Sequence, residues 1–112
     1  MESDILQPAE LDRIFSALAD PTRRAILHRL ARGEATVNAL VAPSGLRQPT
    51  VSKHLKILEE AGLVSRGRAA QTRPVRLEPA PLKAAAQWLG DYEAFWNASY
   101  DRLEAYLKGE EA

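Results

Sequence analysis

The chain of 112 residues is long enough for one domain with a single hydrophobic core. It has no cysteine, which excludes a disulfide framework, a thiolate metal site and a cysteine nucleophile. No apolar run approaches the roughly 20 residues that span a bilayer, and the acidic N-terminus leads into no apolar segment, so we expect a cytoplasmic protein without a membrane partner.

The formal net charge of zero conceals an uneven distribution of charged residues. Residues 21–78 contain eleven basic and four acidic side chains, a net charge of +7, and the two flanks together carry −7. A basic middle between acidic flanks is typical of a chain with a polyanion-binding surface. Ordinary solvated charge gives the same totals, so composition alone leaves both interpretations open.

Four helices are predicted in the first 62 residues, because apolar residues recur there at the three- and four-residue spacing of a buried helix face. The expected helices cover residues 8–19, 21–31, 37–42 and 48–61. Asp20 and Thr36 precede two of them and have side chains that suit an N-cap, and Pro21 suits a first helical position. Gly62 is the expected end of the fourth helix.

A β-hairpin is predicted after the fourth helix. Residues 63–64 begin one strand, and residues 75–77 alternate apolar and basic side chains in a second, on either side of a polar loop. Pro74 is unusual inside a strand, but a two-stranded hairpin has only edges, where proline is tolerated.

A long C-terminal helix is predicted over residues 81–108. Its apolar stripe has a mean spacing of 3.5 residues, which is typical of a helix that packs along another helix. Two interleaved sets with seven-residue intervals form the stripe: Leu82, Leu89, Trp96 and Leu103, and Ala85, Tyr92, Ser99 and Tyr106. Gly90 weakens this helix by up to about 1 kcal/mol and marks the place where a division into two helices would occur.

The third and fourth helices, with the short turn between them, have the order of a DNA-binding helix-turn-helix at residues 36–62. When the apolar residues of the fourth helix point inward, its polar and basic side chains point outward. This outward set comprises Gln48, Thr50, Ser52, Lys53 and Lys56. Gln can form two hydrogen bonds with an adenine edge, Ser and Thr can donate or accept, and Lys reaches guanine or phosphate. We therefore predict that this helix enters the major groove of DNA.

The predicted hairpin at residues 63–78 is the wing that accompanies such a helix-turn-helix. Four arginines occur in it with no acidic residue between them: Arg66, Arg68, Arg73 and Arg76. A basic hairpin of this kind can follow the phosphate backbone or enter the minor groove. Its contacts add salt-sensitive affinity but little discrimination between bases.

Two segments, ADPTRRAIL at residues 19–27 and QPTVSKHLKILEEAGLV at residues 48–64, closely resemble the ArsR/SmtB family of bacterial winged-helix repressors. The resemblance implies a homodimer that occupies a near-palindromic operator and releases it when an effector binds. It also implies that Gln48 and Ser52 contact bases, while Lys53 and His54 lie on or beside the DNA surface.

The predicted architecture is a mainly α-helical winged helix-turn-helix, with four helices, a β-hairpin and one last helix in a single domain of residues 1–112. The helices at residues 8–19 and 81–108 are expected to form a dimer interface. The expected interface residues are Leu11, Phe15, Leu82, Leu89, Tyr92, Trp96, Leu103 and Tyr106.

The sequence argues against transition-metal sensing. Metal-sensing members of the family that it resembles use cysteines near the recognition helix, or histidines and acids on the C-terminal helix. This chain has no cysteine, and its two histidines, His28 and His54, precede that helix. Carboxylates alone would hold only hard ions, and weakly. We therefore expect no metal and no cofactor, and we keep as a hypothesis a small-molecule effector of unknown identity at the aromatic-rich C-terminal helix.

Two alternatives to this function stay open, and so do the roles of three side chains. The functional alternatives are a metal-responsive derepressor and a winged-helix protein-interaction module without specific DNA binding. His54 flanks the apolar stripe of its helix, so a partly buried hydrogen-bonding role competes with DNA contact. For Arg23 and Arg24, solvation or pairing with acids competes with contact to phosphate. An enzyme is not expected, because the sequence has no nucleophile–base pair, glycine-rich phosphate loop or metal-ligand cluster.

Overall fold

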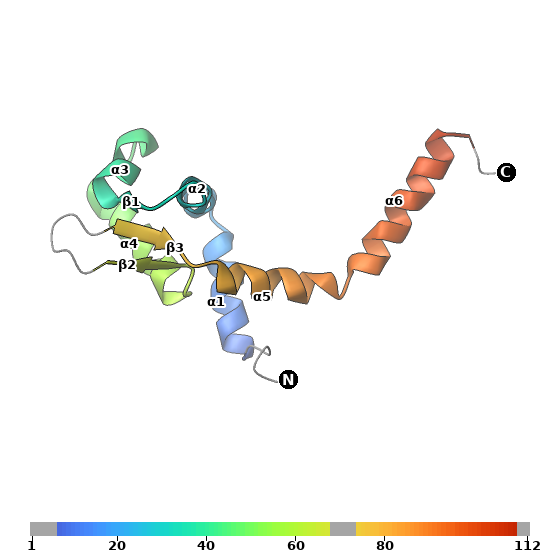
Figure 1. Ribbon diagram of the computed structural model, residues 1–112, viewed down its shortest axis with the longest axis horizontal. Coiled ribbons are helices and arrows are strands. Elements are labelled where there is room, and N and C mark those ends of the chain that lie inside the picture. Colours follow the sequence, from blue (N-terminus) through green and yellow to red (C-terminus); the bar gives the residue numbers. More distant parts are fainter. Residues whose placement is uncertain (1–6, 68–73, 110–112) are drawn as a thin grey trace.

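The computed structural model describes residues 7–67 and 74–109 of the chain. In chain order its elements are helices α1 (Pro8–Leu18) and α2 (Pro21–Leu30), strand β1 (Ala35–Thr36), helix α3 (Val37–Val41), the short 3-10 helix η2 (Ala42–Ser44), helix α4 (Gln48–Glu60), strands β2 (Val64–Arg66) and β3 (Pro74–Leu77), and helices α5 (Pro79–Gly90) and α6 (Glu93–Leu107). The first four helices and the sheet form a head, and α5 and α6 form an arm that leads away from it (Figure 1).

The core of the head is built from one apolar face of each helix and from the inner face of the sheet. Val51, Leu55 and Leu58 of α4 are fully buried, which confirms the inward face predicted for this helix. They pack with buried residues of the other elements: Ala17, Ile26, Leu27, Leu30, Ala35, Leu40, Leu63, Val64 and Val75. Burial of this face fixes which side of α4 is left for solvent or for a partner.

Local signals begin and end the helices at the predicted residues. The Asp20 carboxylate accepts a hydrogen bond from the Arg23 backbone N–H at 3.1 Å, and the Thr36 hydroxyl accepts one from Ala39 N–H at 3.1 Å. Each bond satisfies a backbone donor that the first turn of a helix leaves without an intrahelical partner. Beyond the end of α4, Gly62 has a φ of 75°, a left-handed conformation that glycine adopts without strain.

The sheet has three strands in the order β1-β3-β2, and all neighbours are antiparallel. The predicted hairpin is confirmed, since Val64 pairs with Leu77. The explanation given above for Pro74 is wrong, however, because β1 pairs with the far side of β3 and makes β3 the central strand. Pro74 is tolerated for a different reason: it is the first residue of its strand. A strand of only two residues shows no alternation by which the sequence could reveal it.

The last helix is divided, so the expectation of one continuous helix over residues 81–108 is corrected to α5 and α6. The break follows Gly90, where Asp91 and Tyr92 donate short-range backbone hydrogen bonds to Trp88 and Leu89. After this break α6 projects beyond the head, and none of its residues is buried (Figure 1). The radius of gyration is 18.4 Å, whereas a compact domain of about 100 residues has roughly 13 Å. Among the described helices, none has the length and apolar character needed to cross a membrane.

Candidate nucleic-acid interface

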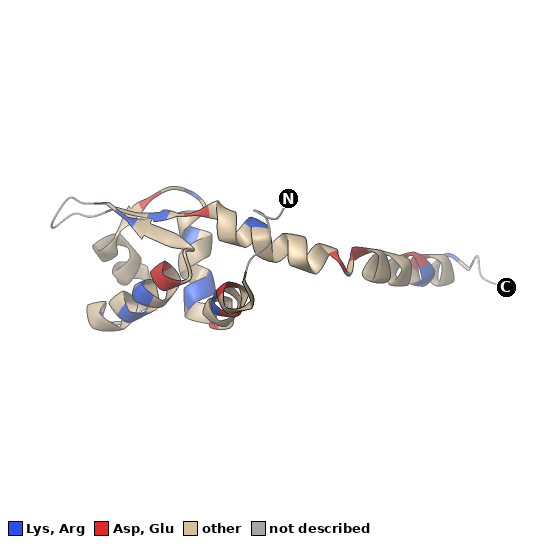
Figure 2. Ribbon diagram, turned by 90° about the horizontal axis from the view of Figure 1, so that it is seen from below, with Lys and Arg blue, Asp and Glu red and all other residues tan. Residues whose placement is uncertain are grey.

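The outer face of α4 is polar and basic. The side chains of Gln48, Thr50, Lys53 and Lys56 are exposed, and Ser52 is half-buried. No hydrogen bond or ion pair joins any of these five side chains to another of the described residues. Basic residues of α4 lie on the head, and α6 extends from the opposite end of the molecule (Figure 2). The structure thus brings together the five residues predicted on this face of α4.

His54 occupies the border of this face, where α4 meets α2. Its Nδ1 lies 3.2 Å from the Arg23 guanidinium and 3.9 Å from the Asp20 carboxylate. Its side chain is only 18% exposed. The imidazole is therefore engaged within the protein, with an edge left toward the solvent.

Arg23 links three helices, a role that the sequence did not reveal. Its guanidinium donates hydrogen bonds to the carbonyl oxygens of Ala17 at 2.8 Å and Ser16 at 3.2 Å, both at the end of α1. The same group contacts His54 of α4. Because Arg23 belongs to α2, one side chain ties the position of α4 to that of α1. The signal in the sequence is the segment at residues 19–27, but periodicity does not indicate the partners of its arginine.

The environment of Asp20 favours its ionised form. The hydrogen bond from Arg23 N–H, then the charge of the Arg23 guanidinium and that of His54, hold the pKa of the Asp20 carboxyl below its ordinary value. Partial desolvation opposes this shift without reversing it. Asp20 therefore supplies a negative charge at the point where α1, α2 and α4 meet.

The two described arginines of the β2–β3 hairpin face acidic side chains. Arg66 Nε lies 3.6 Å from Glu59 of α4, and Arg76 Nε lies 3.7 Å from Glu34. Arg66 Nε is buried without a hydrogen-bond partner among the described residues, so its attraction to Glu59 is one of charge rather than a formed hydrogen bond. Arg68 and Arg73, which were also predicted to contact DNA, lie outside the described residues.

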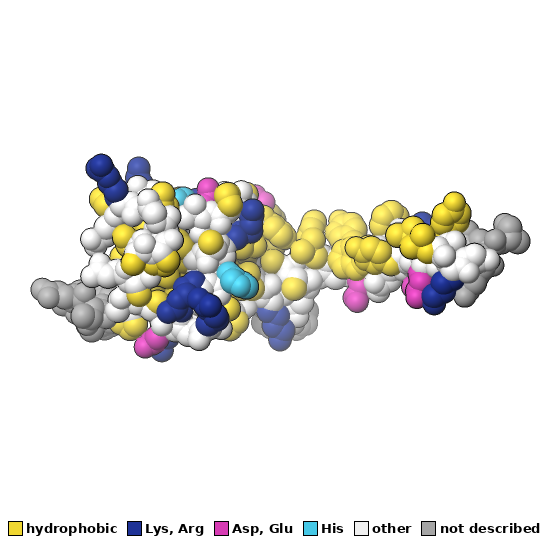
Figure 3. Space-filling view, turned by 90° about the horizontal axis from the view of Figure 1, so that it is seen from above, with side chains coloured by type: hydrophobic (Ala, Val, Ile, Leu, Met, Phe, Trp, Pro, Cys, Tyr) yellow, Lys and Arg dark blue, Asp and Glu magenta, His cyan; other side chains and the backbone are white. Residues whose placement is uncertain are grey.

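The residues predicted at a dimer interface fall into two groups. Leu11 and Phe15 of α1 are half-buried, as is Leu82, which packs against the core. The Phe15 ring meets the Trp88 ring edge to face, with centroids 5.6 Å apart. The other predicted interface residues are exposed along the arm: Leu89, Tyr92, Trp96, Leu103 and Tyr106. Together they give the arm a hydrophobic surface (Figure 3).

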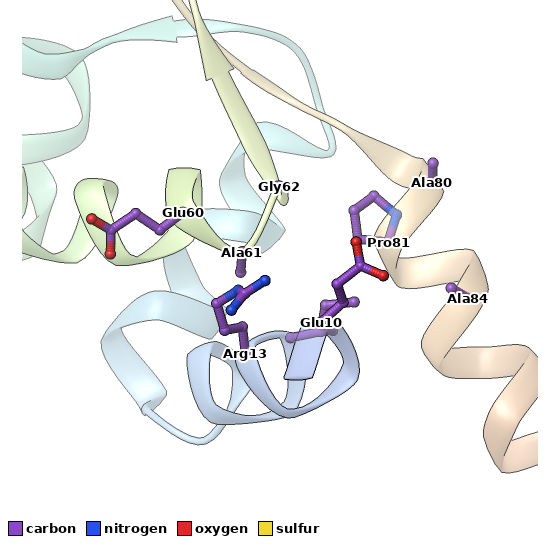
Figure 4. Close-up of a pocket in the computed structure, with 9 residues that line it drawn as sticks. Glu10, Arg13, Glu60, Ala61, Gly62, Ala80, Pro81 and Ala84 are labelled. Atoms are coloured by element: carbon purple, nitrogen blue, oxygen red, sulfur yellow. The ribbon is translucent and has the colours of Figure 1, made fainter. Parts of the chain in front are cut away.

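A hollow of about 320 Å³ lies where α1, the turn after α4 and the start of α5 meet (Figure 4). Arg13 rises from α1 toward the turn at Ala61 and Gly62, and Glu10 lies beside Pro81. Because the walls carry charges of both signs, this hollow favours no single class of ligand. Within residues 7–67 and 74–109, no three His, Asp or Glu side chains form a group that could hold a metal ion.

Comparison with known proteins gives a consistent result for sequence and fold. Residues 20–66 match the family model described as bacterial regulatory protein, arsR family. The chain is 42% identical over 85 residues to the HTH-type transcriptional regulator Rv2034 of Mycobacterium tuberculosis, which covers 76% of this chain and 77% of that protein. It is 32% identical over 79 residues to the transcriptional repressor SdpR of Bacillus subtilis, which covers 70% of this chain and 88% of that protein.

Solved structures share the fold at substantial sequence identity. The crystal structure of the ArsR family transcriptional regulator RHA00566 superposes with a TM-score of 0.75 at 39% identity, covering 82% of this chain and 95% of that one. The solution structure of a homodimeric winged helix-turn-helix DNA-binding domain from Mycobacterium bovis gives a TM-score of 0.61 at 31% identity, covering 77% and 82%. The mainly α-helical winged helix-turn-helix fold is therefore confirmed, and the family consists of transcription regulators, not enzymes. By both its sequence and its fold, the chain belongs to the arsR family of bacterial regulatory proteins.

Proposed function

We propose that the chain represses transcription by binding a near-palindromic DNA operator as a homodimer. The observation that carries this proposal is the outer face of α4, whose polar and basic side chains are exposed or half-buried and make no hydrogen bond or ion pair with another described residue. In this proposal residues 36–62 are the helix-turn-helix and residues 63–78 are the wing. The names of the relatives, a transcriptional regulator and a transcriptional repressor, support the same conclusion.

The proposed complex places α4 in the major groove. Gln48, at the N-terminal end of the helix, and Ser52 contact base edges, and Thr50, Lys53 and Lys56 contact bases or phosphates. The wing arginines add phosphate contacts. Of the two that are described, Arg76 is the better placed, because its side chain is 60% exposed and that of Arg66 only 19%.

The arm supports the dimeric part of the proposal. Of the ten large hydrophobic side chains that are exposed in the described residues, nine belong to residues 88–107. A contiguous apolar surface of this extent marks an interaction site. An operator with two-fold symmetry is matched by a two-fold dimer, which presents one recognition helix to each half-site.

The apolar surface of α6 is too wide for a single helix to cover. Trp96 and Leu103 lie on the seven-residue seam, whereas Phe95, Tyr100 and Leu107 flank it and are 66–76% exposed. A two-stranded coiled coil has only the narrow seam. We therefore propose that each α6 packs against more than one helix of the partner subunit, with Leu11 and Phe15 of α1 at the edge of the interface.

We further propose that an effector binds the dimer and causes it to release the operator. The place of action is the cytoplasm, where bacterial DNA lies. Among the described residues, no contact favours the protein-interaction module, which becomes an outcome of the test below, and no group of side chains is present that would favour the metal-responsive mechanism.

The proposal is tested by fluorescence anisotropy with the DNA upstream of the protein's own gene and with a scrambled duplex, over a series of salt concentrations. We expect at least about a hundredfold preference for the upstream DNA, maintained near physiological salt. Lys53→Ala should reduce the salt slope by about 1, because one phosphate contact is lost, and Lys83→Ala on α5 should leave it unchanged. Weak binding that is equal for both duplexes and disappears as salt rises would instead support the protein-interaction module.

A further inference from the structure

A groove separates α2 from α3 and η2 on one face of the head. Its volume is about 540 Å³, within the range of roughly 300–1,000 Å³ that small-molecule sites occupy. Ile26 and Leu40 form its floor and are 6% and 4% exposed, and Pro43 and Leu46 stand at its side. Hydrophobic side chains lie beside basic ones on this face (Figure 3).

The rim of the groove is basic on the side of α2. His28, Arg29 and Arg32 line it, and no acidic residue appears among the described residues that do so. Arg29 donates a hydrogen bond to the carbonyl oxygen of Gly33 at 3.0 Å, which leaves its charge without a carboxylate. The nearby Glu34 is paired with Arg76. A cationic rim above an apolar floor is complementary to an organic anion with an apolar body.

The floor distinguishes this ligand from inorganic phosphate and from the DNA backbone. A phosphate would pair with the arginines but would gain nothing from Ile26 and Leu40. An aromatic or branched aliphatic acid would bury its apolar body on these side chains and keep its carboxylate at the rim.

The groove is connected to the start of α4 through a short, tied turn. Ser44 donates a hydrogen bond to the Val41 carbonyl oxygen at 2.7 Å and accepts one from Leu46 N–H at 3.0 Å. Both Ser44 and Leu46 line the groove, and Gln48 begins α4 two residues later. A ligand that contacts this turn therefore acts directly on the end of α4 that is proposed to enter the major groove.

We propose that this groove binds a small organic acid with an aromatic or branched aliphatic body, and that its occupancy lowers the affinity of the dimer for DNA. The ligand displaces the η2 turn relative to α2, while Arg23 holds α2 against α1, so the N-terminal end of α4 changes its position relative to the dimer. The effect on DNA rests on the proposed repressor function, whereas binding of the acid does not. By linkage, bound DNA lowers the affinity for the acid by the same factor.

Binding is tested by two-dimensional NMR of the ¹⁵N-labelled full chain, titrated with naphthalene-2-carboxylate and, separately, with its neutral carboxamide. We expect the largest amide shifts at residues 25–32 and 40–46, with the carboxylate binding at least about tenfold more tightly than the carboxamide. Arg32→Gln should remove this preference, and Arg102→Gln on α6 should keep it. Ala25→Phe, which fills the groove, should abolish binding while its circular dichroism melt shows that the protein is folded.

The effect on DNA is measured with the same acid by fluorescence anisotropy. Saturating carboxylate should weaken operator binding by about fivefold or more in the parent and not in Ala25→Phe. Shifts confined to α5 and α6, or equal binding of acid and amide, would overturn the proposed site. If the acid binds in the groove but the protein has no specific DNA target, the repressor function fails and the site stands. If Arg32→Gln weakens DNA binding without any acid present, the rim serves DNA and the proposal is wrong.

Discussion

At the level of single residues, one small network connects α4 to α1 and α2. Asp20 caps α2, Arg23 reaches back to the end of α1, and His54 joins them from α4. The network is only partly buried, so its ion pairs are weak in energy, but its hydrogen bonds are directional. We infer that its main effect is to fix the geometry among α1, α2 and α4.

Asp20→Ala should lower the melting temperature by several degrees at pH 7, because it removes the N-cap of α2. The pKa of Asp20 is lowered in the folded protein, so the stabilisation is fully present above the unfolded carboxyl pKa of about 3.9 and is lost as the pH falls through the lower folded value. The difference in melting temperature between parent and variant should therefore be constant from pH 7 to about 5 and shrink below about 4. Thermal melts over this range measure it.

The control for this prediction is Asp101→Ala, because Asp101 is exposed in the middle of α6 and makes no hydrogen bond or ion pair with another described residue. Asp101→Ala should change the melting temperature only slightly, and the change should not depend on pH in the way expected for Asp20→Ala. If the melting temperatures of Asp20→Ala and the parent differed by the same amount at pH 7 and at pH 2.5, the charge of the Asp20 carboxylate would not contribute to stability.

Gln48→Ala should weaken operator binding by about 1–3 kcal/mol and relax the preference for one base, because the amide is proposed to bond a base edge. Anisotropy with the operator and with single-base variants measures both effects. Gln87→Ala, a change of the same kind at an exposed position on α5, should leave both unchanged. Operator binding by Gln48→Ala as tight as that of the parent would show that α4 does not enter the groove as proposed.

These residues mark how far the sequence could predict the site. The caps Asp20 and Thr36 were predictable, since each depends on a backbone N–H only three residues away. The contact between Arg23 and His54 was not, because it joins residues 31 positions apart whose approach depends on the packing of two helices. The ion pairs of Arg66 and Arg76 were missed for the same reason: their partners lie on other elements.

At the level of elements, α6 is a helix without a core. Its 15 residues include none that is buried, and an isolated helix of this length is only marginally stable in water. The apolar stripe of α6 could be predicted from the sequence, because the seven-residue spacing is a property of the helix itself and does not depend on its packing partner. The two-residue strand β1 was not, because pairing with β3 rather than local preference creates it.

Leu103→Glu should shift the proposed dimer toward monomer, with a dissociation constant raised at least about tenfold, because a carboxylate would be buried in the proposed apolar interface. Sedimentation velocity over a range of concentrations measures the shift. Asn97→Glu adds the same charge to α6 at an exposed position outside the seven-residue seam and should leave the dimer intact. Equal dissociation in both variants would mean that added charge, not the loss of Leu103, drives the change.

At the level of the whole molecule, the proposed DNA-binding face belongs to the head, and the apolar surface proposed for dimerisation belongs to the arm. The chain is 65 Å along its longest axis, and α4 and α6 lie on different parts of it (Figure 2). The core of the head contains no residue of α6, whereas Leu82 of α5 packs against it, so α6 is the part of the arm that does not contribute to this core. In a dimer held by the arms, the separation of the two heads is set by helix packing and not by the DNA.

If helix packing fixes the distance between the two heads of the dimer, the two half-sites of the operator must have a fixed spacing. Two recognition helices in successive major grooves lie about 34–36 Å apart, one turn of DNA. Inserting five base pairs between the half-sites rotates one of them by about half a turn, so a rigid dimer reaches only one. The affinity for the duplex with the central insertion, measured by anisotropy, should fall to that for a duplex with a single half-site. Five base pairs inserted outside both half-sites should leave the affinity unchanged. If the heads are joined through packed helices, as proposed, we expect no compensation by bending of a linker. Unchanged affinity after the central insertion would mean that each subunit binds its half-site independently, and the arm would then serve a purpose other than setting the distance between the heads.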